Sequence, residues 1–274
     1  MISDDLLRVY RKFRKGRTYN LLKKINTLRR VRNFLGSTYG TWLLSRFRLH
    51  GDTIHLETLK KIVKDYKITS IVETGTFLGY TTALFAENFP NLQVYTAEIN
   101  SDFYKKSQKN LKKFKNVHNY LGTSPKFLNH LLKNNLIGER PLFYLDAHWL
   151  DDWPLEDELK IISKNIPSAV ISIDDFKVEG DRRFVYDKYG NKECSLDLAN
   201  PNLEKGKYNL LFPNYNHKKL FKGKIFAPNL IGYVIIFRNM KMEFEDLKKT
   251  NLVKSNYLDK SYLIKTKKSF SKKK

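Results

Sequence analysis

The stretch from Ser70 to Asn100 constrains the fold of this chain more than any other. It begins with a short apolar run, typical of the end of a buried strand, and continues into a turn that contains two glycines. Apolar residues at helical spacing predict a helix over about 80–88, which a proline then ends. A second strand follows over 92–97 and ends on an acid, Glu98. The sequence therefore predicts a strand–turn–helix–strand unit of a parallel α/β sheet.

The turn itself, ETGTFLG over 73–79, differs from the G-x-G-x-x-G turn that seats a pyrophosphate. Gly75 and Gly79 let the backbone approach a ligand that any Cβ would exclude, and the free amides at the helix start favour a polar group. Glu73 places a carboxylate in the turn, which would repel phosphates but suit an ammonium or a sulfonium. Glu98 stands where an acid can accept both hydrogen bonds of a ribose diol. The pattern predicts a nucleoside ligand, and S-adenosylmethionine is the obvious candidate.

With both acids in these positions, residues 70–100 resemble the cofactor loop and post-loop acid of class I S-adenosylmethionine-dependent methyltransferases. The alternative is an ordinary βαβ unit whose glycines serve only the turn. The resemblance also implies that a polar residue after the third strand lies beside the adenine. The cofactor-binding residues expected on this basis are Glu73, Gly75, Thr76, Gly79, Glu98, Thr123 and Ser124.

Further strands are expected over 117–121, 141–145 and 169–173, with helices between them. A strong final strand over 230–237, with a less certain one near 208–212, would form the antiparallel hairpin that closes the class I sheet. We therefore expect an α/β fold, a doubly wound Rossmann-like methyltransferase sheet with a closing antiparallel hairpin and a basic helical N-terminal appendage.

Three units are expected along the 274 residues. Residues 1–50 are the basic helical appendage, 51–240 the methyltransferase domain and 241–274 a lysine-rich C-terminal tail, whose last stretch, 265–274, is most simply a disordered end. Residues 177–206, which are polar and lack periodicity, are expected to be an insertion or lid within the domain. The apolar stripe of the appendage more often packs on the main domain or a second subunit, so a homo-oligomer is one outcome; peripheral membrane contact is the other interpretation.

The formal charge of +23 has two interpretations. It could attract nucleic acid, an anionic membrane surface or an anionic glycan. It could also reflect a lysine-rich coding bias, and the even spread of lysines favours this for most of them. The single cysteine, Cys194, excludes an internal disulfide and fits a reducing compartment, so we expect a cytoplasmic protein. We expect neither a transmembrane helix nor a secretory signal, because long uncharged apolar runs are missing.

Three acids that follow predicted strands form the second signal: Asp146, Asp174 and Asp175. The carboxyl ends of parallel strands meet at one edge of a sheet, where these carboxylates would repel each other unless a cation neutralised them. Oxygen ligands suit Mg²⁺ or another hard divalent ion. Such an ion lowers the pKa of a bound hydroxyl, and His148 can take the proton as general base.

This arrangement resembles the metal-dependent sugar O-methyltransferases of macrolide and aminocoumarin antibiotic biosynthesis. In that family one strand ends in Asp-Gly-Asp and a later one in Asp-Asp-Tyr, where this chain has Asp146-Ala147-His148 and Asp174-Asp175-Phe176. The resemblance implies metal roles for the three acids and, by position only, a base role for His148, which could instead bind the metal. Taken singly, each residue also has a structural use, such as a helix cap, an Asx turn or a hydrogen bond to a carbonyl.

We therefore expect an S-adenosylmethionine-dependent O-methyltransferase that acts on a hydroxyl of a sugar, glycan or glycosylated metabolite, with a divalent metal assisting. Two alternatives remain. The charge favours a nucleic-acid methyltransferase, although the sequence contains no Asn/Asp-Pro-Pro-aromatic motif of base amino-methylating enzymes. The third interpretation is a basic binding protein that has kept a methyltransferase fold without catalysis.

Overall fold

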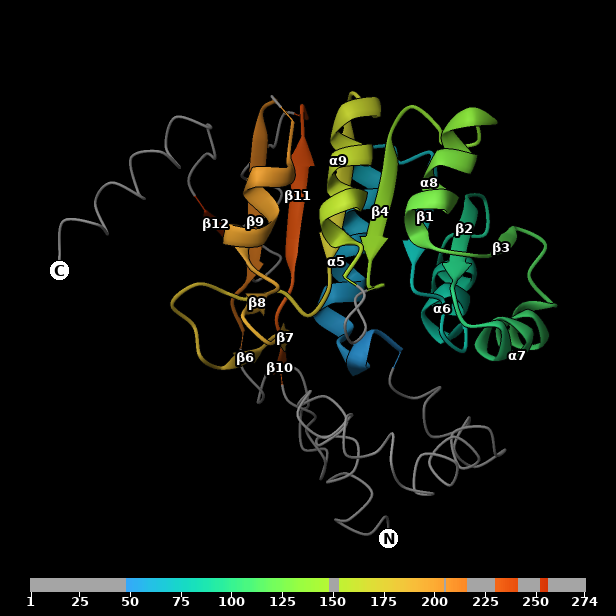
Figure 1. The fold of residues 1–274 in the computed structure, drawn as a ribbon, viewed down its shortest axis with the longest axis horizontal. Coiled ribbons are helices and arrows are strands. Elements are labelled where there is room, and N and C mark those ends of the chain that lie inside the picture. The colour runs from blue at the N-terminus through green and yellow to red at the C-terminus, as the bar shows by residue number, and fades with distance from the viewer. Residues whose placement is uncertain (1–47, 148–152, 205, 216–229, 241–251, 256–274) are drawn as a thin grey trace, which may run out of the picture.

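A computed structural model describes residues 48–147, 153–204, 206–215 and 230–240, and the backbone of 252–255. An eight-stranded sheet runs through it in the order β12-β9-β11-β5-β4-β1-β2-β3 (Figure 1). Five strands are mutually parallel: β1 (Ser70–Thr74), β2 (Gln93–Glu98), β3 (Val117–Leu121), β4 (Pro141–Leu145) and β5 (Ala169–Ile173). The other three alternate in direction beyond β5: β11 (Val234–Arg238), β9 (Tyr208–Pro213) and β12 (Leu252–Ser255).

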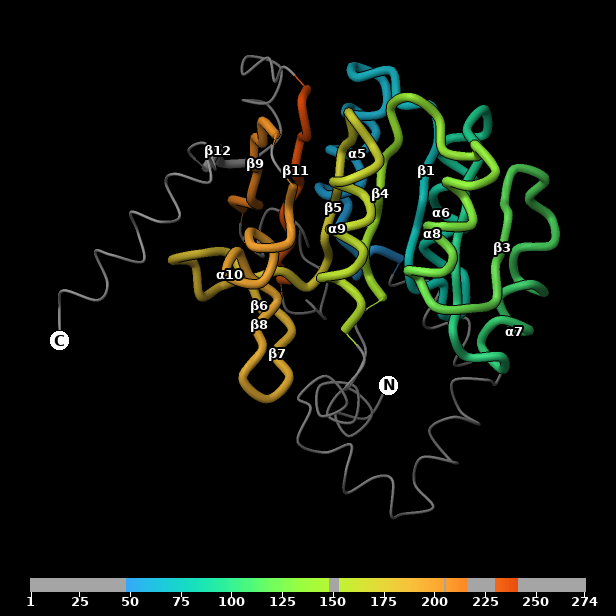
Figure 2. Tube along the Cα trace, turned by 45° about the horizontal axis from the view of Figure 1, so that its top comes forward, coloured from blue at the N-terminus to red at the C-terminus, as the bar shows by residue number. Residues whose placement is uncertain are grey.

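Helices cover both faces of the sheet (Figures 1 and 2). On one face lie α8 (Ser124–Lys133) and α9 (Leu155–Asn165); on the other lie α5 (Thr53–Asp65) and α6 (Tyr80–Asn88). Near the β3 edge, α7 (Ser101–Leu111) follows β2. Asp52 caps α5 by accepting a 2.8 Å hydrogen bond from the amide of His55. The helices bury apolar side chains against the central strands, so every residue of β1, β4 and β5 is buried.

This order, with five parallel strands and an antiparallel closing pair, is the class I methyltransferase fold that the sequence predicted. The parallel strands all end at the lower edge of the sheet in Figure 1. We call this edge the carboxyl rim. It brings together the residues that follow β1, β2, β4 and β5, and ligands bind at this position in open α/β sheets.

The prediction of one long strand over 230–237 was wrong. The stretch divides at Gly232 into β10 (Leu230–Ile231), which pairs with β6 (Phe184–Val185) in a separate small sheet, and β11. Gly232 accepts a 2.8 Å hydrogen bond from the amide of Phe176, and a Cβ at this glycine would overlap the carbonyl oxygen of Phe176. This close crossing, which periodicity cannot reveal, separates the two strands.

The predicted insertion, 177–206, has structure of its own. It contains β6, a hairpin of β7 (Lys188–Tyr189) and β8 (Lys192–Glu193), the short helix α10 (Leu196–Ala199) and the 3-10 turn η2 (Asn200–Asn202). β6, β7 and β8 lie at the carboxyl rim (Figure 1). Whether the insertion acts as a lid stays a prediction.

The ends of the chain are described in part. Residues 241–274, predicted as a lysine-rich tail, contribute β12, which pairs with β9 and extends the sheet by one strand. The stretch predicted as a disordered end, 265–274, lies outside the described residues. From the appendage the structure describes only the 3-10 turn η1 (Arg48–Gly51) before α5, and residues 1–47 lie outside the described part. None of the described helices is long and apolar enough to cross a membrane.

Candidate cofactor and metal site

The glycine-bearing loop crosses the end of β2 and starts α6. The amides of Gly75 and Thr76 both donate to the carbonyl of Ala97, at 3.0 and 2.9 Å, so the loop is fixed to the neighbouring strand. Gly79 caps α6 with a left-handed φ of 79°, which a residue with a Cβ adopts at a cost. Phe77 is also left-handed, at φ 49°, and its ring meets Phe103 of α7 edge-on at 4.6 Å between centroids.

Glu98 ends β2 where the sequence predicted, beside this loop. One carboxylate oxygen accepts from the amide of Phe77 at 2.7 Å, and the other accepts from the amide of Asn100 at 2.8 Å. Burial raises the pKa of Glu98, and the backbone hydrogen bonds oppose that rise. Each carboxylate oxygen has a second lone pair. The geometry therefore leaves Glu98 able to accept two further hydrogen bonds from a diol.

Glu73 lies elsewhere than expected. It belongs to β1, not to the turn, and its side chain is 1% exposed. Its carboxylate accepts hydrogen bonds from the hydroxyls of Thr82 in α6 and Thr96 in β2, the latter at 2.6 Å. Burial raises the pKa of Glu73 to about 7. The placement of Glu73 in the turn is therefore corrected: shielded from solvent, Glu73 joins β1, β2 and α6. Its contact with the ammonium of a ligand stays a prediction.

Two polar residues follow β3, as predicted. Thr123 is the half-buried N-cap of α8, and Ser124 is the first residue of that helix. The hydroxyl of Ser124 is buried and has no hydrogen-bond partner among the described residues. An unpaired buried hydroxyl costs free energy, which a polar ligand atom could recover.

Sequence reasoning missed two apolar side chains around Glu98. Ile99 is 57% exposed and Leu121, which pairs with Glu98 across β2 and β3, is 47% exposed. Both belong to the few large apolar side chains that are exposed in the described part of the chain. A flat apolar group bound beside Glu98 would cover them. The sequence did contain a signal for them: each is an apolar residue at a strand end, where exposure to solvent favours a polar residue.

The acids after β4 and β5 come close to a residue that the sequence did not single out, His50 of η1. Its Nε2 lies 2.7 Å from Oδ2 of Asp174, which also accepts a 2.8 Å hydrogen bond from the hydroxyl of Tyr144. One donor atom each from His50, Asp174 and Asp175 lie within 4.8 Å of one another. No motif could link His50 to Asp174, because 124 positions separate them.

Electrostatics keep Asp174 ionised. Burial alone would raise its pKa, but the charge and hydrogen bond of His50, together with the hydrogen bond from Tyr144, lower it well below the ordinary value. A buried carboxylate that stays negative suits a cation. Asp174 and Asp175 are both buried, whereas Asp146 is half-buried.

Asp146 follows β4 as predicted, and its amide donates to the carbonyl of Thr74 at 3.0 Å. It is not one of the three residues in the close group around His50, which is the group with metal-ligand spacing in the described part of the chain. The predicted set of Asp146, Asp174 and Asp175 is therefore brought together only in part. His148, the predicted base, lies outside the described residues.

Several solved structures of methyltransferases are similar to this chain. No family model matches the chain and no curated protein matches it. Among solved structures, the O-methyltransferase TomG from Streptomyces achromogenes, in complex with SAM, is similar over 69% of this chain and 79% of its own, with a TM-score of 0.48 and 17% identity. An O-methyltransferase from Bacillus cereus in complex with SAH has a TM-score of 0.45 and 17% identity, covering 66% of this chain and 79% of that one.

An rRNA methylase from Streptococcus thermophilus is similar over 67% of this chain and 96% of its own, with a TM-score of 0.42 and 15% identity. At these identities the likeness concerns the fold. The strand order and the closing antiparallel pair define a protein with the class I methyltransferase fold. It carries Glu98 at the end of β2 and the close group of His50, Asp174 and Asp175 next to the end of β5.

Proposed function

We propose that the protein is an S-adenosylmethionine-dependent O-methyltransferase acting on a hydroxyl of a sugar, glycan or glycosylated metabolite, with a divalent metal assisting. The observation that carries the proposal is the placement of Glu98. Its carboxylate is oriented by the amides of Phe77 and Asn100 at the carboxyl end of β2, directly beside the glycine loop.

The cofactor would be held by residues from three strand ends. Glu98 would accept from the ribose hydroxyls, and Ile99 and Leu121 would cover the faces of the adenine. Gly75, Thr76 and Gly79 would supply the backbone surface of the loop, and Thr123 and Ser124 the polar edge beside the base. The bound cofactor supplies an electrophilic methyl group.

The donor set at the ends of β4 and β5 fits a divalent ion, since a cation offsets the cost of burying Asp174 and Asp175 side by side. When bound there, the ion would lower the pKa of a coordinated hydroxyl. Asp146 and His148 follow the neighbouring strand β4, and we propose that they hold and accept the proton that the acceptor hydroxyl releases.

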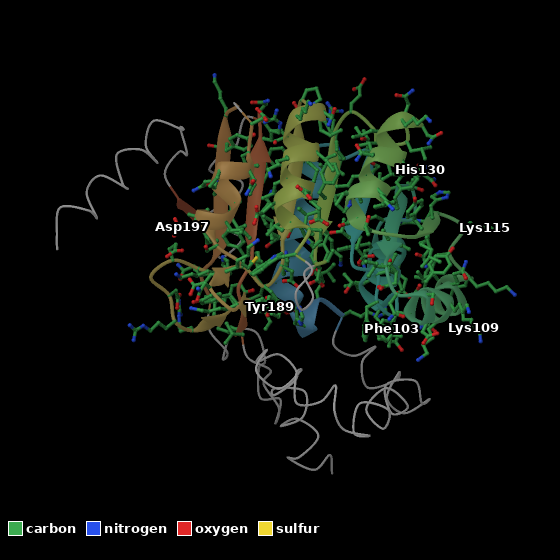
Figure 3. All side chains as sticks on the ribbon, viewed as in Figure 1. Phe103, Lys109, Lys115, His130, Tyr189 and Asp197 are labelled. Carbon is green, nitrogen blue, oxygen red and sulfur yellow. The ribbon has the colours of Figure 1, made fainter. Side chains whose placement is uncertain are left out.

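An aromatic pair supports a sugar-like acceptor. The rings of Trp153 and Tyr189 meet edge-on at 5.3 Å between centroids, and both side chains are half-buried. The hydroxyl of Tyr189 donates to Asp187 at 3.0 Å, and the amide of Asp187 donates to the carbonyl of Asp175 at 2.9 Å. Figure 3 shows Tyr189 at the carboxyl rim. Aromatic side chains of this kind offer an apolar body and a polar edge to a ligand.

The test is a calorimetric titration of S-adenosylhomocysteine into the wild-type chain and into Glu98→Gln, which keeps the shape and removes the charge. We expect micromolar binding to the wild type and a loss of about 10- to 100-fold in Glu98→Gln, because a hydrogen bond to a charged group contributes about 1.5–3 kcal/mol. Glu57→Gln, at an exposed position on α5, is the matched control. No binding to the wild type would leave the non-catalytic binding protein as the better interpretation.

One observation favours nucleic acid as the acceptor instead. The α7 helix begins three residues after Glu98, and with the turn that follows it carries a mostly exposed lysine cluster: Lys105, Lys106, Lys109, Lys112, Lys113 and Lys115. Figure 3 shows Lys109 and Lys115 at the outer end of the molecule, beyond β3. Such a cluster could contact a phosphate backbone. RNA binding that weakens steeply with salt, together with methyl transfer to RNA, would favour this alternative over the sugar.

A further inference from the structure

The η1 turn brings a histidine to the buried acids of the carboxyl rim. The Nε2 atom of His50 lies 2.7 Å from Oδ2 of Asp174, and ligand atoms from His50, Asp174 and Asp175 lie within 4.8 Å of one another. The two acids are 1% and 6% exposed, whereas the side chain of His50 is 23% exposed. The two acids are thus buried, and the imidazole is the most exposed of the three groups.

We propose that His50 is a protein ligand of the divalent metal in this site, together with Asp174 and Asp175, and that Asp146 is outside the ligand set. This inference rests on the metal-assisted function proposed above. It differs from the sequence prediction in the metal ligands, because His50 takes the place of Asp146. Atoms bound to one ion at about 2.0–2.2 Å lie roughly 3–4.4 Å from one another. In the structure the three ligand atoms lie within 4.8 Å of one another, which is near that spacing. Binding an ion would require the 2.7 Å contact between His50 and Asp174 to open.

The backbone explains how two consecutive acids can serve one ion. Successive side chains of a strand point to opposite faces of the sheet. Asp175 leaves the strand with a φ of 52°, which breaks that alternation directly after Asp174. The carbonyl of Asp175 is held by the amide of Asp187 at 2.9 Å, so the turn is supported by the insertion.

The proposed metal ligand Asp174 also accepts a hydrogen bond from a neighbouring buried side chain. The hydroxyl of Tyr144 donates to Asp174 at 2.8 Å, and Tyr144 is itself 1% exposed in the middle of the sheet. Outer hydrogen bonds of this kind orient a ligating carboxylate. Tyr144 would therefore keep its contact with Asp174 when an ion is bound between that carboxylate and His50.

The donor set decides which ion is favoured. Mg²⁺ prefers oxygen ligands only, whereas an imidazole nitrogen beside two carboxylates suits Mn²⁺, Co²⁺ or Zn²⁺. The three-acid set expected from the sequence would select Mg²⁺. With His50 as a ligand we expect the site to bind Mn²⁺ more tightly than Mg²⁺.

The experiment uses the full chain freed of metal and loaded with Mn²⁺. Pulsed electron paramagnetic resonance of the bound ion should show coupling to an imidazole ¹⁴N nucleus in the wild type. The control His130→Gln changes an exposed histidine on α8 and should keep the coupling. His50→Gln should lose it and should weaken Mn²⁺ binding, measured by calorimetry, by about tenfold or more, with a smaller effect on Mg²⁺.

Mn²⁺ bound without nitrogen coupling in the wild type would overturn the inference, and so would the absence of Mn²⁺ binding; neither outcome depends on the folding of a variant. S-adenosylhomocysteine binding to the same sample separates the two proposals. Cofactor binding without a metal would refute the metal site alone. A nitrogen-coordinated metal without cofactor binding would leave the metal site standing and refute the methyltransferase.

Discussion

Gly75 lies directly against the main-chain carbonyl of Asp146. A Cβ placed on Gly75 would overlap the carbonyl oxygen and lie 2.8 Å from the carbonyl carbon. The amide of Asp146 in turn donates to the carbonyl of Thr74 at 3.0 Å. The loop proposed to carry the cofactor and the strand end that carries Asp146 therefore fix each other. Their relative position is set by backbone atoms, which cannot move aside as a side chain can.

Gly75→Ala should consequently destabilise the fold by more than a left-handed backbone alone explains. The φ of Gly75 is 90°, and the added methyl also overlaps backbone. We expect a loss of about 2–4 kcal/mol in the free energy of unfolding, measured with urea. Gly180→Ala, at a φ of 76° with open space among the described residues, should lose about 1 kcal/mol. Equal losses in the two variants would show that the crossing with Asp146 is not tight.

Glu73 should make stability fall as the pH rises. Burial raises its folded-state pKa to about 7 from an ordinary 4.5, so the folded protein holds the proton more tightly. Its contribution is fully present below pH 4.5 and is lost as the pH rises through about 7. At about 1.4 kcal/mol per pH unit, the loss is at most about 3 kcal/mol.

Glu73→Gln removes this titration and keeps an acceptor for Thr82 and Thr96. Urea unfolding at pH 5 and pH 8 should show the variant gaining stability relative to the wild type at the higher pH. Glu57→Gln, on the exposed face of α5, should shift neither value. A constant difference between Glu73→Gln and the wild type at the two pH values would mean that Glu73 is ionised throughout.

His55 should act in the opposite direction. Its ring is 2% exposed and stacks on Tyr233 at 3.6 Å between centroids, while Nε2 lies 3.1 Å from the hydroxyl of Ser172. Burial lowers its pKa to about 4 from 6.5. Stability from the neutral ring is present above pH 6.5 and is lost as the pH falls through about 4, by at most about 3 kcal/mol.

His55→Gln should lower stability at pH 7 through the lost stacking and show a shallower decline between pH 6.5 and 4. Thermal unfolding across that range measures the slope. His118→Gln on the edge strand β3 is the comparison, because His118 is exposed and should leave the slope of the wild type unchanged. Parallel curves for His55→Gln and the wild type would rule out a buried neutral His55.

Local signals were sufficient for most of the fold. The strands 117–121, 141–145 and 169–173 were predicted with the bounds that β3, β4 and β5 have. The last two are short, mostly apolar runs, which is a strong local signal. The position of Glu98 followed in the same way, since it depends only on where β2 ends. The topology of a parallel sheet then brings such strand ends to one rim.

Long-range contacts were beyond the sequence. The division of the final strand arises from the crossing of Gly232 with Phe176, and the histidine beside Asp174 comes from a turn before the domain. The sequence placed Glu73 in the turn, whereas β1 continues to Thr74, and the later strand end changes a loop acid into a buried strand acid. Strand ends of this kind depend on contacts with neighbouring strands and helices, which periodicity does not reveal.

Ser124 offers a test in which stability and affinity change in opposite directions. Its buried hydroxyl has no partner among the described residues, and leaving such a group unpaired costs about 1–3 kcal/mol. Ser124→Ala should therefore raise the free energy of unfolding of the free protein by about 1 kcal/mol. If the bound cofactor pairs with this hydroxyl, the same change should weaken S-adenosylhomocysteine binding several-fold by calorimetry. Ser101→Ala, at the first position of α7 and exposed, should change neither quantity. A more stable variant with unchanged affinity would remove Ser124 from the cofactor site and leave Thr123 as the polar neighbour of the base.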